Sequence, residues 1–175
     1  IRWGELPASD LLARRLGETG QAIVASPAYL ATHGTPRTPR ELEAHNRLGW
    51  SYRRVVADWP LLVDGRVVAL PVSGTVRVSD GETLRHLVLS GIGLARLSLY
   101  HVHDDLLTGR LVPVLEDFNP REMQPIHAVY LGKAGRVPAR VRAVLDHLVE
   151  QVNLSERFAP HRVAAPRRAR KSTTA

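Results

Sequence analysis

The sequence contains no cysteine, which excludes disulfide bonds and metal sites with thiolate ligands. It also has no apolar stretch long enough to cross a bilayer and no signal peptide. We therefore expect a cytoplasmic protein that does not contact membranes. The first residue is Ile1 rather than Met, which is consistent with a fragment of a longer protein.

The motifs of several large enzyme classes are also missing. The dinucleotide fingerprint G-x-G-x-x-G fails because Arg96 occupies the third glycine position after Gly91 and Gly93. No G-x-S-x-G elbow, P-loop or H-E-x-x-H zinc motif occurs. Glu116 and Asp117 are adjacent in a connector and make a poor acid–base pair. We predict that the chain is not an enzyme.

One group of potential metal ligands lies in the expected helix Tyr100–Leu107. Its members are His101, His103, Asp104 and Asp105. On a helix only His101 would share a face with one of the two aspartates, and no further ligands follow nearby. We interpret the group as a solvated helix face, and we predict neither a metal nor a cofactor.

The positive charge is concentrated at the C-terminal end. After Glu156 the chain carries six basic residues and no acidic one, and subtracting these six from the net charge of +7 leaves Ile1–Glu156 at +1. A nearly neutral body is not a general polyanion-binding surface. We expect residues 157–175 to form a disordered basic tail, which is solvated rather than bound to DNA phosphates.

The stretch from Val72 to Leu97 predicts a strand, a helix and a second strand. Apolar and polar residues alternate from Val72 to Val78, which is typical of a half-buried strand. Ser79 and Glu82 then have the spacing of a capping box that begins a helix, and Gly91 suits its end.

Ligands of open α/β sheets bind near the carboxyl ends of strands, and the start of a helix favours an anion. Ser79 and Asp80 are therefore a candidate anion site. The alternative is a capping box that only begins a helix.

Strands and helices alternate along the rest of the chain, which predicts an α/β fold. Strands are expected at Ile1–Gly4, Leu11–Leu16, Gln21–Ala25, Leu48–Tyr52, Leu111–Leu115 and Ile126–Leu131. Helices are expected at Pro27–Thr32, Thr38–His45, Tyr100–Leu107 and Pro138–Val152. Asp64-Gly65 predicts a hairpin between Leu61–Val63 and Arg66–Leu70.

The order and spacing of four segments resembles the ligand-sensing region of LysR-type transcriptional regulators. The segments are LLARRLGETGQAIVASPAYLATHGTPRTPRELEAHNRL, DGETLRHLVLSGIGLARL, DDLLTGRLVPVLEDF and PIHAVYLGKAGRVPARVRAVLDHLVE. Two positions depart from that family: Ser98 stands where proline is usual, and Arg96 stands where a small or apolar residue is common.

The resemblance implies an α/β, two-lobed fold like that of type 2 periplasmic binding proteins, with the first lobe incomplete. Residues 1–25 and 120–156 would form the first lobe, and residues 26–119 the second. The strand Gln21–Ala25 would pair with Ile126–Leu131. An incomplete first lobe would leave a sheet edge uncovered, so we expect self-association or low stability.

By the same resemblance, the chain would be the effector-sensing domain of a transcriptional regulator. A small-molecule effector would bind between the lobes. Promoter DNA would be bound through an N-terminal winged helix-turn-helix that this sequence lacks, and the full-length protein would form a homo-oligomer, dimer or tetramer. The alternative is a periplasmic solute-binding protein of a transporter. The implied effector-binding residues are Arg2, Trp3, Gly4, Ser26, Ser51, Tyr52, Ser79, Asp80, Ile126 and His127.

Overall fold

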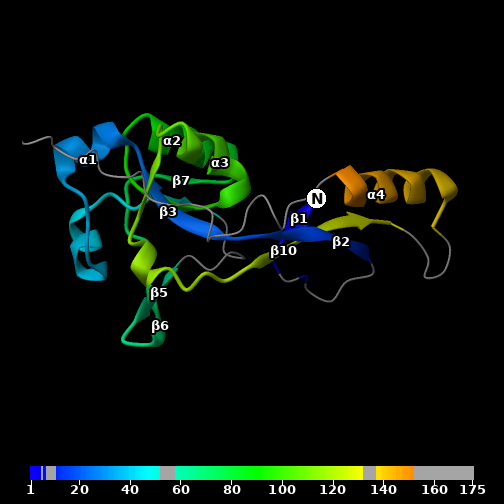
Figure 1. The fold of residues 1–175 in the computed structure, drawn as a ribbon, viewed down its shortest axis with the longest axis horizontal. Coiled ribbons are helices and arrows are strands. Elements are labelled where there is room, and N and C mark those ends of the chain that lie inside the picture. The colour runs from blue at the N-terminus through cyan, green and yellow to red at the C-terminus, as the bar shows by residue number, and fades with distance from the viewer. Residues whose placement is uncertain (5, 7–10, 52–57, 132–136, 152–175) are drawn as a thin grey trace, which may run out of the picture.

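Two groups of elements lie end to end in the computed structural model, which describes residues 1–4, 6, 11–51, 58–131 and 137–151. The first group contains β1 (Arg2–Trp3), β2 (Leu12–Thr19), β10 (Gln124–Tyr130) and α4 (Ala139–Gln151), on the right in Figure 1. All other described elements form the second group. We call these two groups the first and second lobes.

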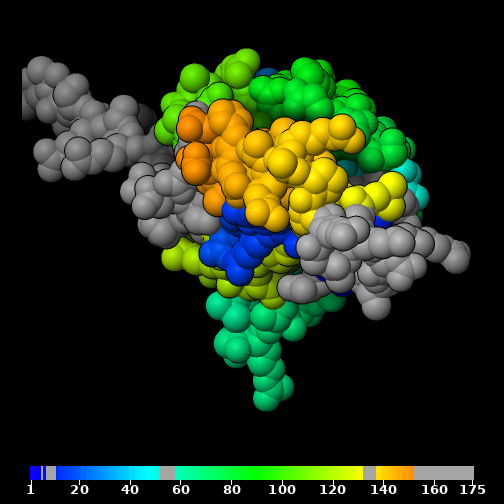
Figure 2. Space-filling view, turned by 90° about the vertical axis from the view of Figure 1, so that its right-hand side faces the viewer, coloured from blue at the N-terminus to red at the C-terminus, as the bar shows by residue number. Residues whose placement is uncertain are grey.

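The first lobe is an antiparallel sheet covered on one face by a helix. Its strand order is β1-β10-β2. Leu145 of α4 packs against Leu16, Ile126 and Ala128 of the sheet, and these four side chains are buried. Figure 2 shows α4, in orange and yellow, lying over the blue β2.

The second lobe is built on β3 (Gln21–Ala25), which lies between β8 (Ala95–Ser98) and β9 (Val112–Val114) in an antiparallel sheet. An isolated parallel bridge joins Arg47 to Leu94 at the β8 side. Beyond it β4 (Gly49–Trp50) pairs in parallel with β7 (Arg77–Val78). Together these pairings place the strands in one continuous layer that contains both parallel and antiparallel neighbours.

Two separate cores cover the faces of this layer. Helices α2 (Gly81–Leu89) and α3 (Leu99–Leu107) pack on one face. On the other face lie α1 (Pro27–His33), the 3-10 helices η1 (Pro39–Ala44) and η2 (Glu116–Phe118), and β5 (Trp59–Val63). The fully buried Val24 and the nearly buried Ile23 of β3 face opposite cores, as alternation along a strand requires.

The prediction that Gln21–Ala25 pairs with Ile126–Leu131 is wrong. β3 pairs with β8 and β9, and β10 pairs with β1 and β2. All five β3 residues are buried, because helices or loops cover both faces of the second-lobe sheet. β3 therefore belongs with residues 26–119, and the chain passes between lobes at Gly20 rather than after Ala25.

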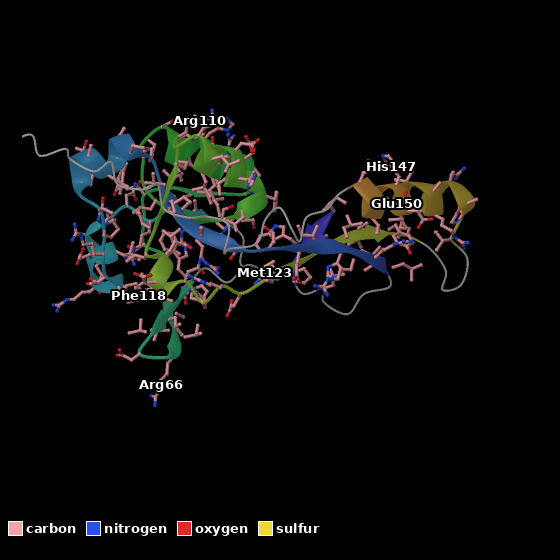
Figure 3. All side chains as sticks on the ribbon, viewed as in Figure 1. Arg66, Arg110, Phe118, Met123, His147 and Glu150 are labelled. Carbon is pink, nitrogen blue, oxygen red and sulfur yellow. The ribbon has the colours of Figure 1, made fainter. Side chains whose placement is uncertain are left out.

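The chain returns to the first lobe through residues 119–123, and Figure 3 labels Met123 on this segment. The Asn119 side chain donates a hydrogen bond of 2.8 Å to the carbonyl of Gln21. The two connections between the lobes are thus tied together where they cross.

Most local signals for turns and helix ends are confirmed. α1 begins at Ser26, whose hydroxyl accepts from the Tyr29 amide, and it ends at Gly34. Asp64 and Gly65 both have positive φ in the hairpin between β5 and β6 (Arg66–Leu70). Gly91 has a φ of 74° after α2, a backbone conformation that favours glycine.

The expected strand from Val72 to Val78 is shortened to Arg77–Val78. The Asn46 side chain accepts from the Thr75 amide at 2.9 Å, so this part of the backbone bonds to a side chain instead of a neighbouring strand. Position 74 requires glycine, because the Cβ of any other residue would lie only 2.1 Å from the Arg47 carbonyl oxygen.

The hairpin of β5 and β6 projects from the second lobe (Figures 1 and 2). Trp59 and Leu61 anchor its base in the core, whereas Val67 and Val68 of β6 are exposed. Figure 3 shows Arg66 at the far end of the hairpin, pointing away from the body.

The interpretation of His101–Asp105 as a solvated helix face is wrong for Asp105. Its carboxylate is fully buried and accepts from Arg85 of α2 at 2.5 and 3.0 Å. Arg110 adds a contact of 2.6 Å from beyond the end of α3. This ion pair joins α2 to α3.

Replacement of Asp105 by Asn should lower the free energy of unfolding by about 3 kcal/mol, because it leaves Arg85 without its buried counter-charge. Urea denaturation measures the change. Glu82→Gln is the matched control, since Glu82 also contacts Arg85 but its side chain is 57% exposed. Glu82→Gln should lower the free energy of unfolding by less than about 1 kcal/mol. Equal effects of the two variants would contradict the assigned role of Asp105.

Candidate functional site

The ends of several strands of the second lobe meet the first lobe at one edge. Ser51 follows β4, Ser79 follows β7 and Leu99 follows β8, and these strand ends are adjacent in the layer. The Ser51 amide donates to the Val78 carbonyl at 2.8 Å, and the Leu99 amide donates to Gly20 at 2.9 Å. The expected position of a ligand in an open α/β sheet is this edge.

Two tryptophans contact each other across the lobes at this edge. The ring centroids of Trp3 in β1 and Trp50 in β4 are 6.2 Å apart, with the planes tilted by 49°. Tyr100, at the start of α3, packs against the buried cluster of the first lobe. Aromatic side chains from both lobes therefore line the junction, and such rings commonly line small-molecule sites.

Helix α2 begins at the same edge, but its cap differs from the prediction. The Asp80 carboxylate accepts from the Thr83 amide at 2.8 Å and is the N-cap. Ser79 is exposed, and Glu82 contacts Arg85 instead of completing a capping box. The hydrogen bonds from Thr83 lower the pKa of Asp80, so this carboxylate is ionised at neutral pH and already neutralises part of the helix start.

His101 of α3 packs directly on the first residue of α2. A Cβ on Gly81 would lie 2.3 Å from the His101 ring, so only glycine leaves room for this contact. Burial lowers the pKa of His101, with nearby Glu82 and Asp80 acting in the opposite direction. The Nδ1 atom of His101 is buried and has no hydrogen-bond partner. A neutral imidazole thus lies beside the Asp80 cap.

The first lobe contributes β1 and β10 to the junction. Arg2 is opposite His127 and Trp3 is opposite Ile126 in their antiparallel pairing, and the Gly4 amide donates to Pro125 at 2.8 Å. The Ile126 side chain packs in the core beneath α4. Its neighbour His127 points to the other face, and its buried Nδ1 has no hydrogen-bond partner.

The segments of most expected effector-binding residues meet at the lobe junction, namely those of Arg2, Trp3, Gly4, Ser51, Ser79, Asp80 and His127. Their side chains do not all share one face, because Trp3 lies on the α4 side of the first-lobe sheet whereas Arg2 and His127 lie on the other side. Ile126 is buried in the core under α4 and does not reach the junction surface. Ser26 does not join them, because it is buried after the other end of β3, where it caps α1. Figure 1 shows α1 on the side of the second lobe away from the first lobe. Tyr52 lies outside the described residues.

A separate open pocket of about 540 Å³ lies on the outer side of the second lobe. Tyr29 and His33 of α1, Asn46 and the loop around Thr75 line it. The Tyr29 and His33 rings stack with centroids 4.2 Å apart, so His33 forms part of its wall. We call this cavity the outer pocket.

A family model for the LysR substrate binding domain matches residues 1–153. The chain belongs to this family. It is 39% identical over 152 residues to the HTH-type transcriptional regulator CrgA of Neisseria meningitidis, covering 87% of this chain and 50% of CrgA. It is 31% identical over 151 residues to the HTH-type transcriptional regulator DmlR of Escherichia coli, covering 85% and 48%.

Solved structures of LysR regulators show the same fold. The CrgA regulatory domain matches with a TM-score of 0.77 and 38% identity, covering 85% of this chain and 72% of that domain. Full-length AphB of Vibrio cholerae, a virulence activator, matches with a TM-score of 0.69 and 29% identity over 86% of this chain and 50% of AphB. The chain is thus a LysR effector-binding domain with the periplasmic-binding-protein-like fold, and it spans about half the length of the curated relatives it matches.

The relatives also bear on the alternatives raised from the sequence. They are named as transcriptional regulators, which supports the regulator and not the transporter interpretation. Among the described residues no group of three or more His, Asp or Glu side chains is placed to hold a metal ion. Likewise, none of the described helices combines the length and apolar character of a membrane span.

Three residues at or near the junction were missed from the sequence. Trp50 precedes the predicted Ser51 by one position, and its place at the end of a strand was the available signal. Tyr100 and His101 lie two and three residues after the end of β8, and the rule that ligands bind after strands applies to them as well.

Replacement of Asp80 by Ala should lower the melting temperature, whereas Ser79→Ala should leave it nearly unchanged, because only Asp80 caps α2. Since the folded pKa of Asp80 is lowered, its contribution is present above the ordinary value of 3.8 and disappears as the pH falls through the folded value. Thermal melts of both variants at several pH values test this. A larger loss of melting temperature in Ser79→Ala than in Asp80→Ala would show that Ser79 caps the helix, as the capping box predicts.

Proposed function

We propose that the chain binds a small-molecule effector between its two lobes, and that the bound effector controls promoter binding by the full-length regulator in the cytoplasm. The contact of Trp3 with Trp50 carries this proposal, because it places aromatic side chains of both lobes at the edge where strands end. A ligand there would contact both lobes at once. It would therefore favour one relative orientation of the lobes over others.

The residues proposed to contact the effector are Trp3, Trp50, Ser51, Ser79 and His101. They offer aromatic surface, two hydroxyls and one imidazole, a set suited to a small polar or aromatic molecule. We assign no catalytic role to them. Their function is recognition, and the response is a change in how the lobes are held.

The full-length protein is proposed to bind DNA through a helix-turn-helix and to act as a homo-oligomer. The relatives support this because CrgA and DmlR are named HTH-type regulators. The region matched here corresponds to their sensing part, so DNA recognition would lie in the remainder of the regulator.

A ligand that binds the native state between the lobes should raise the melting temperature of the chain and change its tryptophan emission. At a ligand concentration of about 100 times Kd the stabilisation is about 2.7 kcal/mol. Benzoate, succinate and benzyl alcohol are suitable first probes, measured by thermal shift and fluorescence. The emission change should be lost in Trp50→Phe and kept in Trp59→Phe, because Trp59 is buried at the base of the hairpin.

The outer pocket provides the discriminating control. His33→Ala alters that pocket and should leave the response to the ligand unchanged. Suppose that the ligand no longer raises the melting temperature of His33→Ala and does not change the emission of Trp3 and Trp50 in the wild type. The ligand then occupies the outer pocket, and the proposed site is wrong.

In gel-shift assays the chain alone should show no sequence-specific DNA binding at about 200 mM salt, where weak phosphate contacts are screened. The longer protein with a helix-turn-helix should bind under the same conditions. Unlabelled promoter and unrelated DNA as competitors distinguish specific from non-specific complexes. A specific shift by this chain would contradict the proposed division between sensing and DNA recognition.

A further inference from the structure

The outer pocket is a cavity that the proposed effector site does not use. Its volume of about 540 Å³ lies within the usual range for small-molecule sites. All of its described lining residues belong to the second lobe, and α1, which forms part of its wall, lies at the end of that lobe far from the first lobe (Figure 1). A ligand in the outer pocket would therefore not contact the lobe junction, and the pocket is a separate candidate site.

Tyr29 is held in one position at the wall of this pocket. Its hydroxyl oxygen accepts from the Asn46 amide at 3.1 Å, because a backbone amide can only donate. The hydroxyl proton is then free to donate to Nδ1 of His45 at 3.2 Å. Burial lowers the pKa of His45, which keeps its imidazole neutral and able to accept this hydrogen bond. Tyr29 therefore offers the pocket a fixed aromatic ring rather than a free hydroxyl.

His33 stacks on Tyr29 and presents one ring nitrogen to a ligand. The two ring planes are only 11° from parallel. Nδ1 of His33 lies 3.1 Å from the Tyr29 carbonyl oxygen, and since a carbonyl can only accept, Nδ1 must carry the proton. In the neutral ring Nε2 then has a lone pair, and no described residue donates to it. His33 thus offers a hydrogen-bond acceptor whose direction is fixed by the stack.

The other lining of the outer pocket is held in place and carries no charge. The Asn46 side chain donates to the Ile92 carbonyl at 2.7 Å and accepts from the Thr75 amide at 2.9 Å. The Ile92 side chain is 41% exposed and adds apolar surface. Among the described residues that line the pocket, none is an aspartate, glutamate, lysine or arginine. Such a lining favours a neutral ligand, because a charged one would lose water without gaining a counter-charge.

We propose that the outer pocket binds a neutral planar molecule whose ring carries a hydrogen-bond donor in its plane, with the donor bonded to Nε2 of His33. Phenols are the simplest molecules of this class. A donor fixed in the ring plane loses less conformational freedom on binding than one on a flexible methylene, as in benzyl alcohol. The ligand would lie against Asn46 and Thr75, whose hydrogen bonds join segments of the second lobe, and would stabilise that lobe. This inference goes beyond the proposed function and does not depend on it.

The test titrates phenol and anisole into the whole chain and two variants. Anisole is the matched probe, because it has the same ring but its oxygen cannot donate. His33→Phe keeps a ring for the stack and removes Nε2. His86→Phe is the matched control, since Nδ1 of His86 also bonds to a carbonyl four residues earlier, that of Glu82 at 2.9 Å, but His86 does not line the pocket. Amide and indole chemical shifts of the ¹⁵N-labelled proteins give the affinities and locate the probe.

The wild type should bind phenol with a Kd on the order of 1 mM, as expected for so small a molecule. The shifts should affect the amides of Tyr29, His33 and Thr75 and spare the indoles of Trp3 and Trp50. His33→Phe should bind phenol about fivefold to tenfold more weakly, the loss expected for one hydrogen bond. Anisole should bind the wild type as weakly and should not distinguish it from His33→Phe. The His86→Phe control should bind both probes as the wild type does.

The inference is overturned if phenol and anisole bind the wild type equally, if His86→Phe weakens phenol binding as much as His33→Phe, or if about 10 mM phenol gives no binding. Shifts confined to Trp3 and Trp50 would also overturn it, because phenol would then occupy the lobe junction, a result that supports the proposed function. If phenol binds beside His33 while benzoate, succinate and benzyl alcohol leave the emission of Trp50 unchanged, the inference stands and the proposed function loses its support.

Discussion

One side-chain amide fastens the segments that place the candidate site. Asn46 donates to the Ile92 carbonyl at 2.7 Å and to the Thr75 hydroxyl at 3.0 Å, and its oxygen accepts from the Thr75 amide at 2.9 Å. Its own carbonyl accepts from Leu94 at 2.9 Å. A buried or half-buried amide with its donors and acceptor satisfied fixes geometry in a way that apolar packing does not. Glycines at 74 and 93 allow the backbones to approach this closely.

The effect of that amide extends along the strands to the lobe junction. Once the segment after Asn46 is held between β8 and β7, the strand ends at Ser51 and Ser79 fall at one edge. The buried pair of Arg85 and Asp105 fixes the helices on the same face. Asn46 holds strands of the layer together, and the Arg85–Asp105 ion pair holds together the two helices that cover one face of the layer. The edge facing the first lobe is therefore held by two independent interactions. A sensing domain needs such a rigid lobe if ligand binding is to be transmitted as a movement between lobes.

The sequence predicted those elements whose ends depend on neighbours within a few residues. The hairpin at Asp64-Gly65, the end of α2 at Gly91 and the α1 limits all follow from local backbone requirements. It failed where a distant residue decides the outcome. Val72–Val76 has the alternation of a strand, yet Asn46, 29 residues away from Thr75, captures its backbone. The β3 sequence is apolar enough for either lobe, and only its pairing with β8 and β9 assigns it to the second.

The candidate site shows the same division between local and long-range information. The end of a strand and the start of a helix could be located from the sequence, which is why Ser79 was named, whereas Trp3 and Ser51 came from the resemblance to the family. Charge pairing could not be located from the sequence, because it joins residues far apart in the chain. Asp105 was taken for a solvated acid and is fully buried between two arginines. Arg96 was noted only as a departure from a motif, and its buried atom lacks any partner. Glu122 acts on Arg96 only at longer range, from the segment that returns to the first lobe. A charge relation between residues on different elements leaves no local pattern in the sequence, so the environment of Arg96 could be found only from the fold.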